Sequence, residues 1–327
     1  MIRVAINGFG RIGRMVLRAG IHEPGMEFVA VNDLTDVPTL AHLLKYDSVH
    51  GRFNGRVEAG EGKLAVNGKS ILVLSESDPK KLPWKKLNID VVVESTGRFL
   101  KREDAALHLK AGAKKVILTA PPKGKGVETF VKGVNDGRLS GTIISNASCT
   151  TNSLAPLVYV LDKEFGIETG LMTTVHSYTA DQRLVDAPHK DLRRARAAGI
   201  NIVPTTTGAA TAAGEAYPKL KGKLDGMALR VPTADGSFTD FTCILKKKAT
   251  KEQINAAMKE AASNELAGVM QYSEEPLVSS DIIGNPASVV FDAGLTKVLG
   301  RLAKVCGWYD NEWGYSKRVV DMVKEMG

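Results

Sequence analysis

The sequence contains little cysteine: Cys149, Cys243 and Cys306 are its three thiols among 327 residues. An odd number of widely separated cysteines does not form a disulfide framework, so we expect a reducing compartment. No apolar run has the length of a membrane span, and the first residues indicate a strand instead of a signal peptide. Internal repeats, low-complexity segments and metal-ligand spacings are also lacking. We therefore expect a cytoplasmic protein that holds no metal.

The chain is long enough for about two domains of roughly 150 residues each. Its formal net charge is +8, which raises the question of a nucleic-acid partner. The basic residues are scattered with acids between them, however, and only Arg193, Arg194 and Arg196 form a compact group. A solvated basic surface explains the scatter, and small anionic ligands explain the arginine group. We therefore do not expect nucleic acid as the primary partner.

A glycine-rich turn follows the first predicted strand. Ile2–Ile6 alternates as a strand, Gly8-Phe9-Gly10-Arg11-Ile12-Gly13 comes next, and a helix then ends at Gly20. A second strand, Phe28–Asn32, ends in Asp33. This is the context of a dinucleotide site: the glycines admit a pyrophosphate and Asp33 accepts the adenine ribose hydroxyls. The carboxylate of Asp33 repels a ribose 2′-phosphate, which favours NAD over NADP. The alternative to a dinucleotide site is an incidental glycine turn.

The first half of the chain continues as strands and helices in alternation. We predict a helix over 39–50, a hairpin region over 51–68, a strand over 89–93, a helix over 104–110 and a strand over 115–119. Ligands bind at the carboxyl ends of the strands of such an open, mostly parallel sheet. Polar residues stand at these ends: Glu94, Ser95, Thr96, Thr119 and Cys149. This arrangement predicts a thiol beside the cofactor.

Cys149 follows a short strand that ends at Ile144 and precedes a helix that ends at Gly166. Helix N-termini favour anions, and the thiolate is the reactive form of cysteine. Pro156 removes one helical N–H and is expected to strain this helix. We predict a nucleophile, while the alternative is a small buried cysteine that acts as a hydrophobe.

His176 directly follows a predicted strand, Leu171–Val175. An imidazole there can hold the thiol as a thiolate and later transfer a proton, although most such histidines are structural. The stretch 177–204 has few regular signals and indicates a functional or interface loop. Thr205–Ala210 offers hydroxyls and backbone donors to phosphate, or is a Thr-rich turn before a helix.

The second half contains further alternating segments, at 227–231, 239–246, 288–292 and 302–308, with an amphipathic helix over 251–266. They predict an antiparallel type of sheet. The expected fold class is α/β: a Rossmann-type doubly wound parallel sheet plus an α+β catalytic domain with a mostly antiparallel sheet. The predicted domains are 1–148 and 149–311, the latter with the 177–204 loop, and a final helix is predicted over 312–327.

Together these residues resemble the phosphorylating glyceraldehyde-3-phosphate dehydrogenases of bacterial type. The likeness runs through nearly the whole chain and is most specific at Ser148-Cys149-Thr150-Thr151-Asn152. It implies an NAD-dependent glycolytic or gluconeogenic oxidoreductase that converts glyceraldehyde 3-phosphate and phosphate to 1,3-bisphosphoglycerate. Cys149 would form a hemithioacetal and then a thioester, His176 would act as the base, and the Cys149 N–H and His176 would stabilise the oxyanion.

The resemblance also assigns binding residues and partners. It implies a homotetramer, a C-terminal helix over 312–327 that returns to the cofactor domain, and two anion sites, one for the substrate phosphate and one for the attacking phosphate. The substrate-phosphate site would hold Thr179, Asp181 and Arg230, and the second Ser148, Thr150, Thr207 and Gly208. Arg194 or its neighbour Arg193 would lie near one of them. Cofactor contacts would come from Gly8, Gly10, Arg11, Ile12, Gly13, Asp33, Thr96, Thr119, Asn311 and Tyr315, with Asn311 on the nicotinamide carboxamide.

Four departures from the family pattern stand out. Ser153 replaces a second cysteine of many relatives, and Ala187 replaces a leucine of NAD-specific ones, which leaves NADP use open. Segments 211–217 and 234–236 are atypical. An erythrose-4-phosphate dehydrogenase is a close alternative, although its members usually lack the Pro188–Asp191 stretch. A secondary role in binding RNA or protein also stays open.

Overall fold

The computed structural model describes residues 1–327, apart from the side chain of Arg138. Its contacts divide the chain into two compact units. The first unit comprises Met1–Phe130, Arg138–Ala147 and Ser316–Gly327, and the second comprises Val131–Gly137 and Ser148–Tyr315. Each unit holds one sheet, and the predicted fold class is confirmed. Among the described residues, no helix combines the length and the apolar character needed to cross a bilayer.

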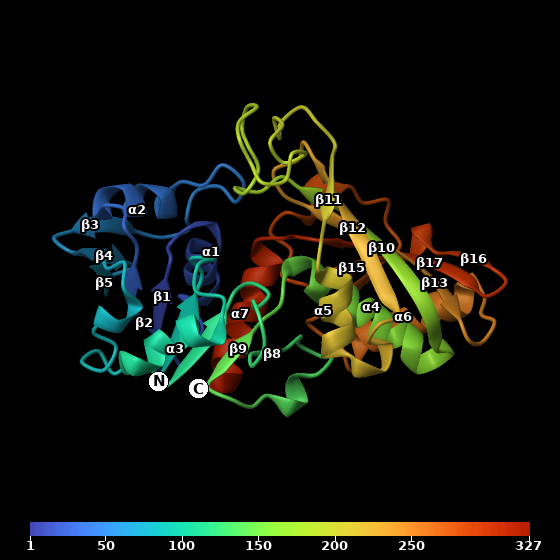
Figure 1. The fold of residues 1–327 in the computed structure, drawn as a ribbon, viewed down its shortest axis with the longest axis horizontal. Coiled ribbons are helices and arrows are strands. Elements are labelled where there is room, and N and C mark those ends of the chain that lie inside the picture. Colours follow the sequence, from blue (N-terminus) through green and yellow to red (C-terminus); the bar gives the residue numbers. More distant parts are fainter. The chain divides into compact units, whose positions relative to one another are not determined.

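The first unit is built on a nine-stranded sheet in the order β3-β4-β5-β2-β1-β6-β7-β9-β8 (Figure 1). Its strands are β1 Ile2–Asn7, β2 Met26–Asn32, β3 Val57–Gly60, β4 Lys63–Val66, β5 Lys69–Leu74, β6 Val91–Glu94, β7 Lys115–Leu118, β8 Glu128–Thr129 and β9 Ile143–Ser145. Its helices are α1 Arg11–Gly20, α2 Val37–Lys45, α3 Arg102–Lys110 and most of α7 Trp313–Met326. Pairing is parallel except within the β3-β4-β5 meander, of which β3 and β4 lie in the predicted hairpin region and β5 follows it.

The central strands of this sheet are apolar because both of their faces are covered. In β1 and β6, Val4, Ile6 and Val91–Val93 have no exposed surface, as continuous Val/Ile runs of buried parallel strands predict. In register, Asn7 of β1 lies opposite Glu94 of β6 and Asn32 of β2. Polar residues therefore begin at one carboxyl edge of the sheet, directly after its apolar core.

Two predicted helices have clearly wrong bounds: the one predicted over 251–266 ends at Ser263, and the other differs more. The sequence predicts a helix over 39–50, but α2 begins at Val37 and ends at Lys45. Asp36 caps its start by accepting from the Thr39 N–H, and Tyr46 already has extended dihedral angles. The remaining residues form a turn around Asp47, whose Oδ1 accepts the N–H groups of Val49 and His50. An aspartate that binds the backbone in this way competes with helix.

The second unit holds an eight-stranded sheet in the order β11-β12-β10-β13-β17-β15-β14, with β16 paired to β17. Its strands are β10 Ile167–Ser177, β11 Val203–Thr206, β12 Leu224–Val231, β13 Ser237–Leu245, β14 Met270–Ser273, β15 Val289–Asp292, β16 Lys297–Leu299 and β17 Leu302–Tyr309. Its helices are α4 Cys149–Phe165, α5 Ala209–Ala216 and α6 Lys251–Ser263. Figure 1 shows these three helices gathered beside the strands. The sheet is mostly antiparallel, as predicted, but β10–β12 and β14–β15 are parallel.

Short 3-10 segments join several of these elements. They are Pro79–Lys81, Asp136–Arg138, Pro218–Leu220, Ser279–Ile282 and Ala293–Leu295. The stretch 178–202 contains no helix or strand and one isolated bridge, between Arg183 and Ala197. The irregular loop predicted over 177–204 is confirmed, except that Ser177 belongs to β10 and the last two residues belong to β11.

Helix α4 runs unbroken through Pro156. Proline has no N–H to donate, so Pro156 cannot make the usual helical hydrogen bond to a carbonyl four residues earlier. The side chains from Thr150 to Val158 are nevertheless buried, and α4 packs on β10, β13, β15 and β17. Tertiary packing therefore maintains the helix, and the strain expected at Pro156 does not end it. The first residue of this buried helix is Cys149.

Candidate active site and nucleotide pocket

The nucleophile candidate stands at the very start of α4. Ser148 is the N-cap: its Oγ accepts the Thr151 N–H at 3.1 Å, and its neighbour Cys149 is the first helical residue. The residue before the cap, Ala147, has φ +56°, the left-handed region that side chains rarely adopt. This bend turns the chain from β9 into the helix. Cys149 as a residue is half-buried, whereas Cys243 and Cys306 are buried.

The thiol lies against the predicted base. Cys149 Sγ is 3.4 Å from His176 Nε2, so the structure brings together the two residues that sequence could not show to be in contact. His176 is the penultimate residue of β10, where it pairs with Arg230 of the parallel strand β12. A strand end thus supplies the imidazole, and a neighbouring strand in register supplies a cation beside it.

The second ring nitrogen of His176 has two neighbours of opposite character. Nδ1 is 2.7 Å from the Ser177 carbonyl, which only accepts, and 2.8 Å from Arg230 Nη1, which only donates. A proton on Nδ1 therefore binds the carbonyl and leaves the Nε2 lone pair facing the thiol. Without that proton, Nδ1 accepts from Arg230 and Nε2 carries the hydrogen. A base that acts through Nε2 requires the first tautomer.

The pKa shifts of this pair favour its uncharged form. Burial raises the pKa of the Cys149 thiol, against the opposing effects of the Arg230 charge and of hydrogen bonds from Thr150. Burial and the Arg230 charge together lower the pKa of His176 to about 3. The sequence led us to expect a thiolate held by an imidazolium; a guanidinium at 2.8 Å from the ring disfavours that second positive charge.

A buried tyrosine, Tyr309, contacts His176 and the residue after Cys149, and the sequence did not predict this role. The Tyr309 hydroxyl lies 2.8 Å from both Thr150 Oγ1 and Thr174 Oγ1, and its ring meets the His176 imidazole edge-on. Burial raises the pKa of Tyr309, so it stays a neutral hydroxyl. Tyr309 thereby links the first turn of α4 to strand β10. The alternation of β17 marks it as a core residue, but no sequence signal reveals these partners.

Arg194 organises the predicted anion-binding residues. Its Nη1 binds Asp181 Oδ2 at 2.5 Å, its Nε binds Thr205 Oγ1 at 2.9 Å and its Nη2 binds the Thr206 carbonyl at 3.2 Å. Of the two arginines left open by the sequence, Arg194 makes these contacts, whereas Arg193 contributes backbone bonds: its N–H donates to Asp191 Oδ1 and its carbonyl accepts the Arg196 N–H.

Asp181 and Arg230 belong to the same cluster, and the charges of both act on His176. Burial raises the pKa of Asp181, but the Thr179 hydrogen bond and the charges of Arg230 and Arg194 outweigh burial and leave it below its ordinary value. Arg230 Nε is buried and has no hydrogen-bond partner among the described residues. Thr207 and Gly208 follow β11, with Gly208 as the N-cap of α5. Unpaired donors and a charge of this kind suit an anion.

Asn311 and Tyr315 lie at the end of the second unit. Asn311 is 6% exposed, and its Oδ1 accepts from Ser237 Oγ at 2.6 Å. Tyr315 is buried in α7, which begins at Trp313. The sequence gives no sign of the Ser237 contact, because 74 residues separate the two partners.

The first unit contains a pocket of about 270 Å³ at the carboxyl edge of its sheet. It is lined by Gly8, Gly10, Asp33 and Thr96 among the predicted cofactor residues, and also by Asn7, Asn32, Leu34, Glu76, Ser77, Ser95, Arg98 and Phe99. A Cβ on Gly8 would stand 2.6 Å from the Thr96 N, and one on Gly13 would stand 2.2 Å from the Gly8 carbonyl. Gly10 faces open space at the N-terminus of α1, which has no side-chain cap and no acid in its first turn. Free N–H groups at such an opening fit a pyrophosphate.

Several of the predicted cofactor residues of the first unit have protein partners. Asp33 accepts the Phe9 and Thr35 N–H groups, one on each oxygen, which fixes the carboxylate at the rim of the pocket. The Thr96 N–H donates to the Glu94 carboxylate, and the Thr119 hydroxyl donates to the Glu94 carbonyl. Arg11 forms an ion pair with Asp47, while Ile12 is part of α1 and is partly exposed. Thr119, Arg11 and Ile12 do not line the pocket.

Buried Glu94 anchors this pocket, although the sequence marks it only as a strand-end acid. Its carboxylate accepts from Asn7 Nδ2 at 2.6 Å and lies 2.9 Å from His108 Nε2. The Trp84 indole donates to His108 Nδ1 at 3.0 Å, so the imidazole proton must lie on Nε2 and face Glu94. Hydrogen bonds to the buried Glu94 carboxylate thus fix Asn7 and Thr96, which line the pocket.

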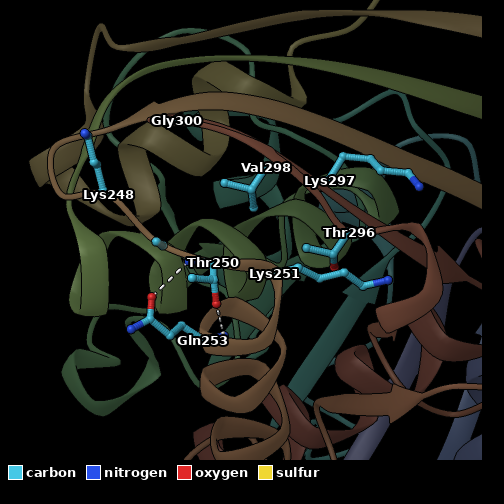
Figure 2. A pocket seen from close by; sticks show the side chains of 9 residues that line it. Lys248, Thr250, Lys251, Gln253, Thr296, Lys297, Val298 and Gly300 are labelled. Carbon is cyan, nitrogen blue, oxygen red and sulfur yellow. Dashed lines mark hydrogen bonds between the residues drawn. The ribbon is translucent and has the colours of Figure 1, made fainter.

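A cavity of about 680 Å³ in the second unit lies apart from this chemistry. It is formed by the start of α6 and by β16, and none of the predicted site residues lines it. Figure 2 shows the amino groups of Lys248 and Lys297 directed away from the cavity. Its size therefore does not mark the functional site.

Comparisons with known proteins identify relatives for both halves of the chain. The family model described as the NAD binding domain of glyceraldehyde 3-phosphate dehydrogenase matches residues 2–102, and the model of the C-terminal domain matches residues 148–311. The chain is 58% identical to a glyceraldehyde-3-phosphate dehydrogenase of Geobacillus stearothermophilus, over 98% of this chain and 97% of the relative. It is 61% identical to one of Thermotoga maritima, over 99% and 98%.

Proposed function

Since the chain belongs to the glyceraldehyde-3-phosphate dehydrogenase family, as its sequence predicts, we propose that it oxidises glyceraldehyde 3-phosphate to 1,3-bisphosphoglycerate with NAD and inorganic phosphate. The observation that carries the proposal is the 3.4 Å approach of Cys149 Sγ to His176 Nε2, with Arg230 beside the ring. NAD fits the first unit because uncapped N–H groups, two tightly packed glycines and a fixed Asp33 surround the pocket. Bound NAD supplies a hydride acceptor.

The chain's own residues carry the protons. In the Nδ1–H tautomer, His176 accepts the thiol proton through Nε2 while Sγ bonds to the aldehyde carbon, and the proton then passes to the carbonyl oxygen. The hemithioacetal on Cys149 returns its hydroxyl proton to Nε2 as its hydride leaves. A thioester on Sγ remains. Phosphate attacks its carbonyl carbon, the carbon–sulfur bond breaks, and the thiol is regenerated.

Oxyanion stabilisation and anion binding follow from the same cluster. The Cys149 N–H at the start of α4 and the protonated Nε2 of His176 are the donors for a developing oxyanion. Arg230, with its unpartnered Nε, and Arg194 supply positive charge for the substrate phosphate, with Thr179 and Asp181 as neighbours. Ser148, Thr150, Thr207 and Gly208 are proposed for the attacking phosphate. An anion beside Arg230 would also reduce the repulsion that disfavours a charged His176.

A spectrophotometric assay at 340 nm tests the proposal. With glyceraldehyde 3-phosphate and NAD we expect turnover that needs phosphate; without phosphate we expect a burst of about one NADH per chain, because the thioester accumulates. Cys149→Ser should abolish both while the Kd for NAD stays unchanged. Cys243→Ala, a buried thiol of β13, is the matched control and should keep activity. Full turnover without phosphate, or activity in Cys149→Ser, would contradict the proposal.

We further propose a homotetramer that forms through the 177–204 loop. Large apolar side chains of this loop are exposed: Leu184 87%, Leu192 80% and Ile200 82%. A cluster of this kind on one segment marks an interface. Leu192→Asp should dissociate the assembly in sedimentation velocity, whereas Leu299→Asp, at an exposed leucine of β16, should not. A monomeric wild-type chain would refute the proposal.

A further inference from the structure

Asn311 offers a donor that the protein itself does not use. The residue is 6% exposed, its backbone N–H binds Asp235 Oδ1 at 3.2 Å, and its Oδ1 accepts from Ser237. No described residue accepts a hydrogen bond from Asn311 Nδ2. A nearly buried amide with a free –NH₂ group requires an acceptor from elsewhere.

Ser237 determines which way this amide faces. Its Oγ accepts the Ser177 N–H at 3.1 Å, and an N–H can only donate. The single Ser237 proton must then find an acceptor inside a site with no exposed surface, and the Asn311 atom 2.6 Å away must therefore be Oδ1. If Nδ2 stood there, the hydroxyl would accept twice and its proton would have no partner. The hydrogen-bond donors and acceptors around Ser237 Oγ thus determine which atom of the Asn311 amide faces it.

Asp235 fixes the backbone of the same residue. Its Oδ1 accepts the N–H groups of Gly236 and Asn311, and its carboxyl group shares a hydrogen bond with Asp310. Burial and the charge of Asp310 raise the pKa of Asp235, so Asp235 carries the shared proton. Asp310 in turn accepts the N–H groups of Gly284, Glu312 and Trp313 at the start of α7.

The turn that precedes Ser237 and carries Asp235 packs closely against the chain at Ser279. Gly236 has φ +82°, and a Cβ there would stand 2.2 Å from the carbonyl of Ser279. Segment 234–236, which departs from the usual family pattern, therefore forms a defined support at the start of β13.

We propose that Ser237 and Asp235 are positioning residues that hold Asn311 so that its Nδ2 donates to the nicotinamide carboxamide oxygen of bound NAD. Ser237 orients the side chain, and Asp235 fixes the main chain. The inference rests on the proposed function, because it takes NAD as the cofactor, and on the contact of Asn311 with the nicotinamide carboxamide that the family resemblance implies. It adds Asp235 of the atypical segment 234–236 and Ser237, the first residue of β13, to the residues that position the cofactor, without a direct contact of either with NAD.

Calorimetric titration with NAD and with ADP-ribose, which lacks the nicotinamide, isolates this contact. Ser237→Ala frees the amide to turn, so the Kd for NAD should rise about tenfold while that for ADP-ribose stays constant. Asp235→Ala should behave likewise. Asp235→Asn retains a donor to Asp310 and an acceptor for the Asn311 N–H, so it should restore wild-type affinity. Ser288→Ala removes a buried hydroxyl with no hydrogen-bond partner and is the matched control.

Asn311→Ala separates failure of this inference from failure of the proposed function. An unchanged ratio of the two Kd values in Asn311→Ala would overturn the nicotinamide assignment itself. If Asn311→Ala loses its preference for NAD over ADP-ribose but Ser237→Ala keeps it, the positioning role alone would be overturned. Equal weakening of NAD and ADP-ribose in Ser237→Ala would also overturn it, because a general structural defect acts on both nucleotides.

Discussion

Removing the positive charge of Arg230 should raise the pKa of His176 part of the way toward its ordinary value. Arg230 Nη1 lies 2.8 Å from Nδ1, and the pKa of the ring is lowered to about 3 by burial and by this charge. Two unit charges about 4 Å apart interact by about 4 kcal/mol at an effective dielectric constant of about 20. At about 1.4 kcal/mol per pKa unit, and with partial exposure of Arg230 reducing the effect, Arg230→Gln should raise the His176 pKa by about two units.

Carbon-13 NMR of ring-labelled histidine measures this shift, because the chain has only six histidines and His176→Asn identifies the signal. The wild-type signal should not titrate above about pH 4.5, whereas that of Arg230→Gln should titrate near pH 5. Arg196→Gln, at an exposed arginine paired with Asp186, is the control. The Arg230 charge also lowers the thiol pKa, so alkylation of Arg230→Gln by iodoacetamide at pH 8 should be slower than in the wild type. Unchanged titration of His176 in Arg230→Gln would refute the electrostatic argument.

Three further substitutions test other parts of the structure. Asp33→Gly removes the carboxylate that repels a 2′-phosphate, so kcat/KM for NADP relative to NAD should rise at least about tenfold in steady-state assays; an unchanged ratio would contradict the role of Asp33. Tyr309→Phe leaves two buried threonine hydroxyls without their partner and should lower the free energy of unfolding by about 1–3 kcal/mol in urea; a loss under about 0.5 kcal/mol would show that these bonds contribute little. Gly236→Ala should lower Tm by several degrees, because a Cβ would stand 2.2 Å from a carbonyl at positive φ; an unchanged melting curve would mean that the loop adapts.

Local patterns predicted much of the fold. The strand, glycine turn and helix from Ile2 to Gly20 occur as expected, because β alternation and glycine spacing act over a few residues. The strand end at His176 and the helix start at Cys149 were predicted for the same reason. Parallel pairing of β10 with β12 was not predicted, since alternation indicates a strand but not the direction of its neighbour.

Contacts between distant residues explain what the sequence could not provide. The hydroxyl of Tyr309 reaches a threonine 159 positions away, and Ser237 binds an asparagine 74 positions away. The charge state of the thiol and imidazole depends on Arg230, which only the register of two strands brings alongside. The placement of α2 depended on backbone capture by Asp47, a local effect that helical periodicity does not register.

The hydroxyl of Ser153 has a consequence for oxidative damage. It stands one helical turn after Cys149 and binds Thr239 Oγ1 at 2.9 Å, so the helix offers a serine where a resolving thiol would have to lie. The other two cysteines, Cys243 and Cys306, are buried in the sheet. A sulfenic acid formed on Cys149 by peroxide would therefore need a small external thiol for rescue, and without one it would pass to the irreversible sulfinic state.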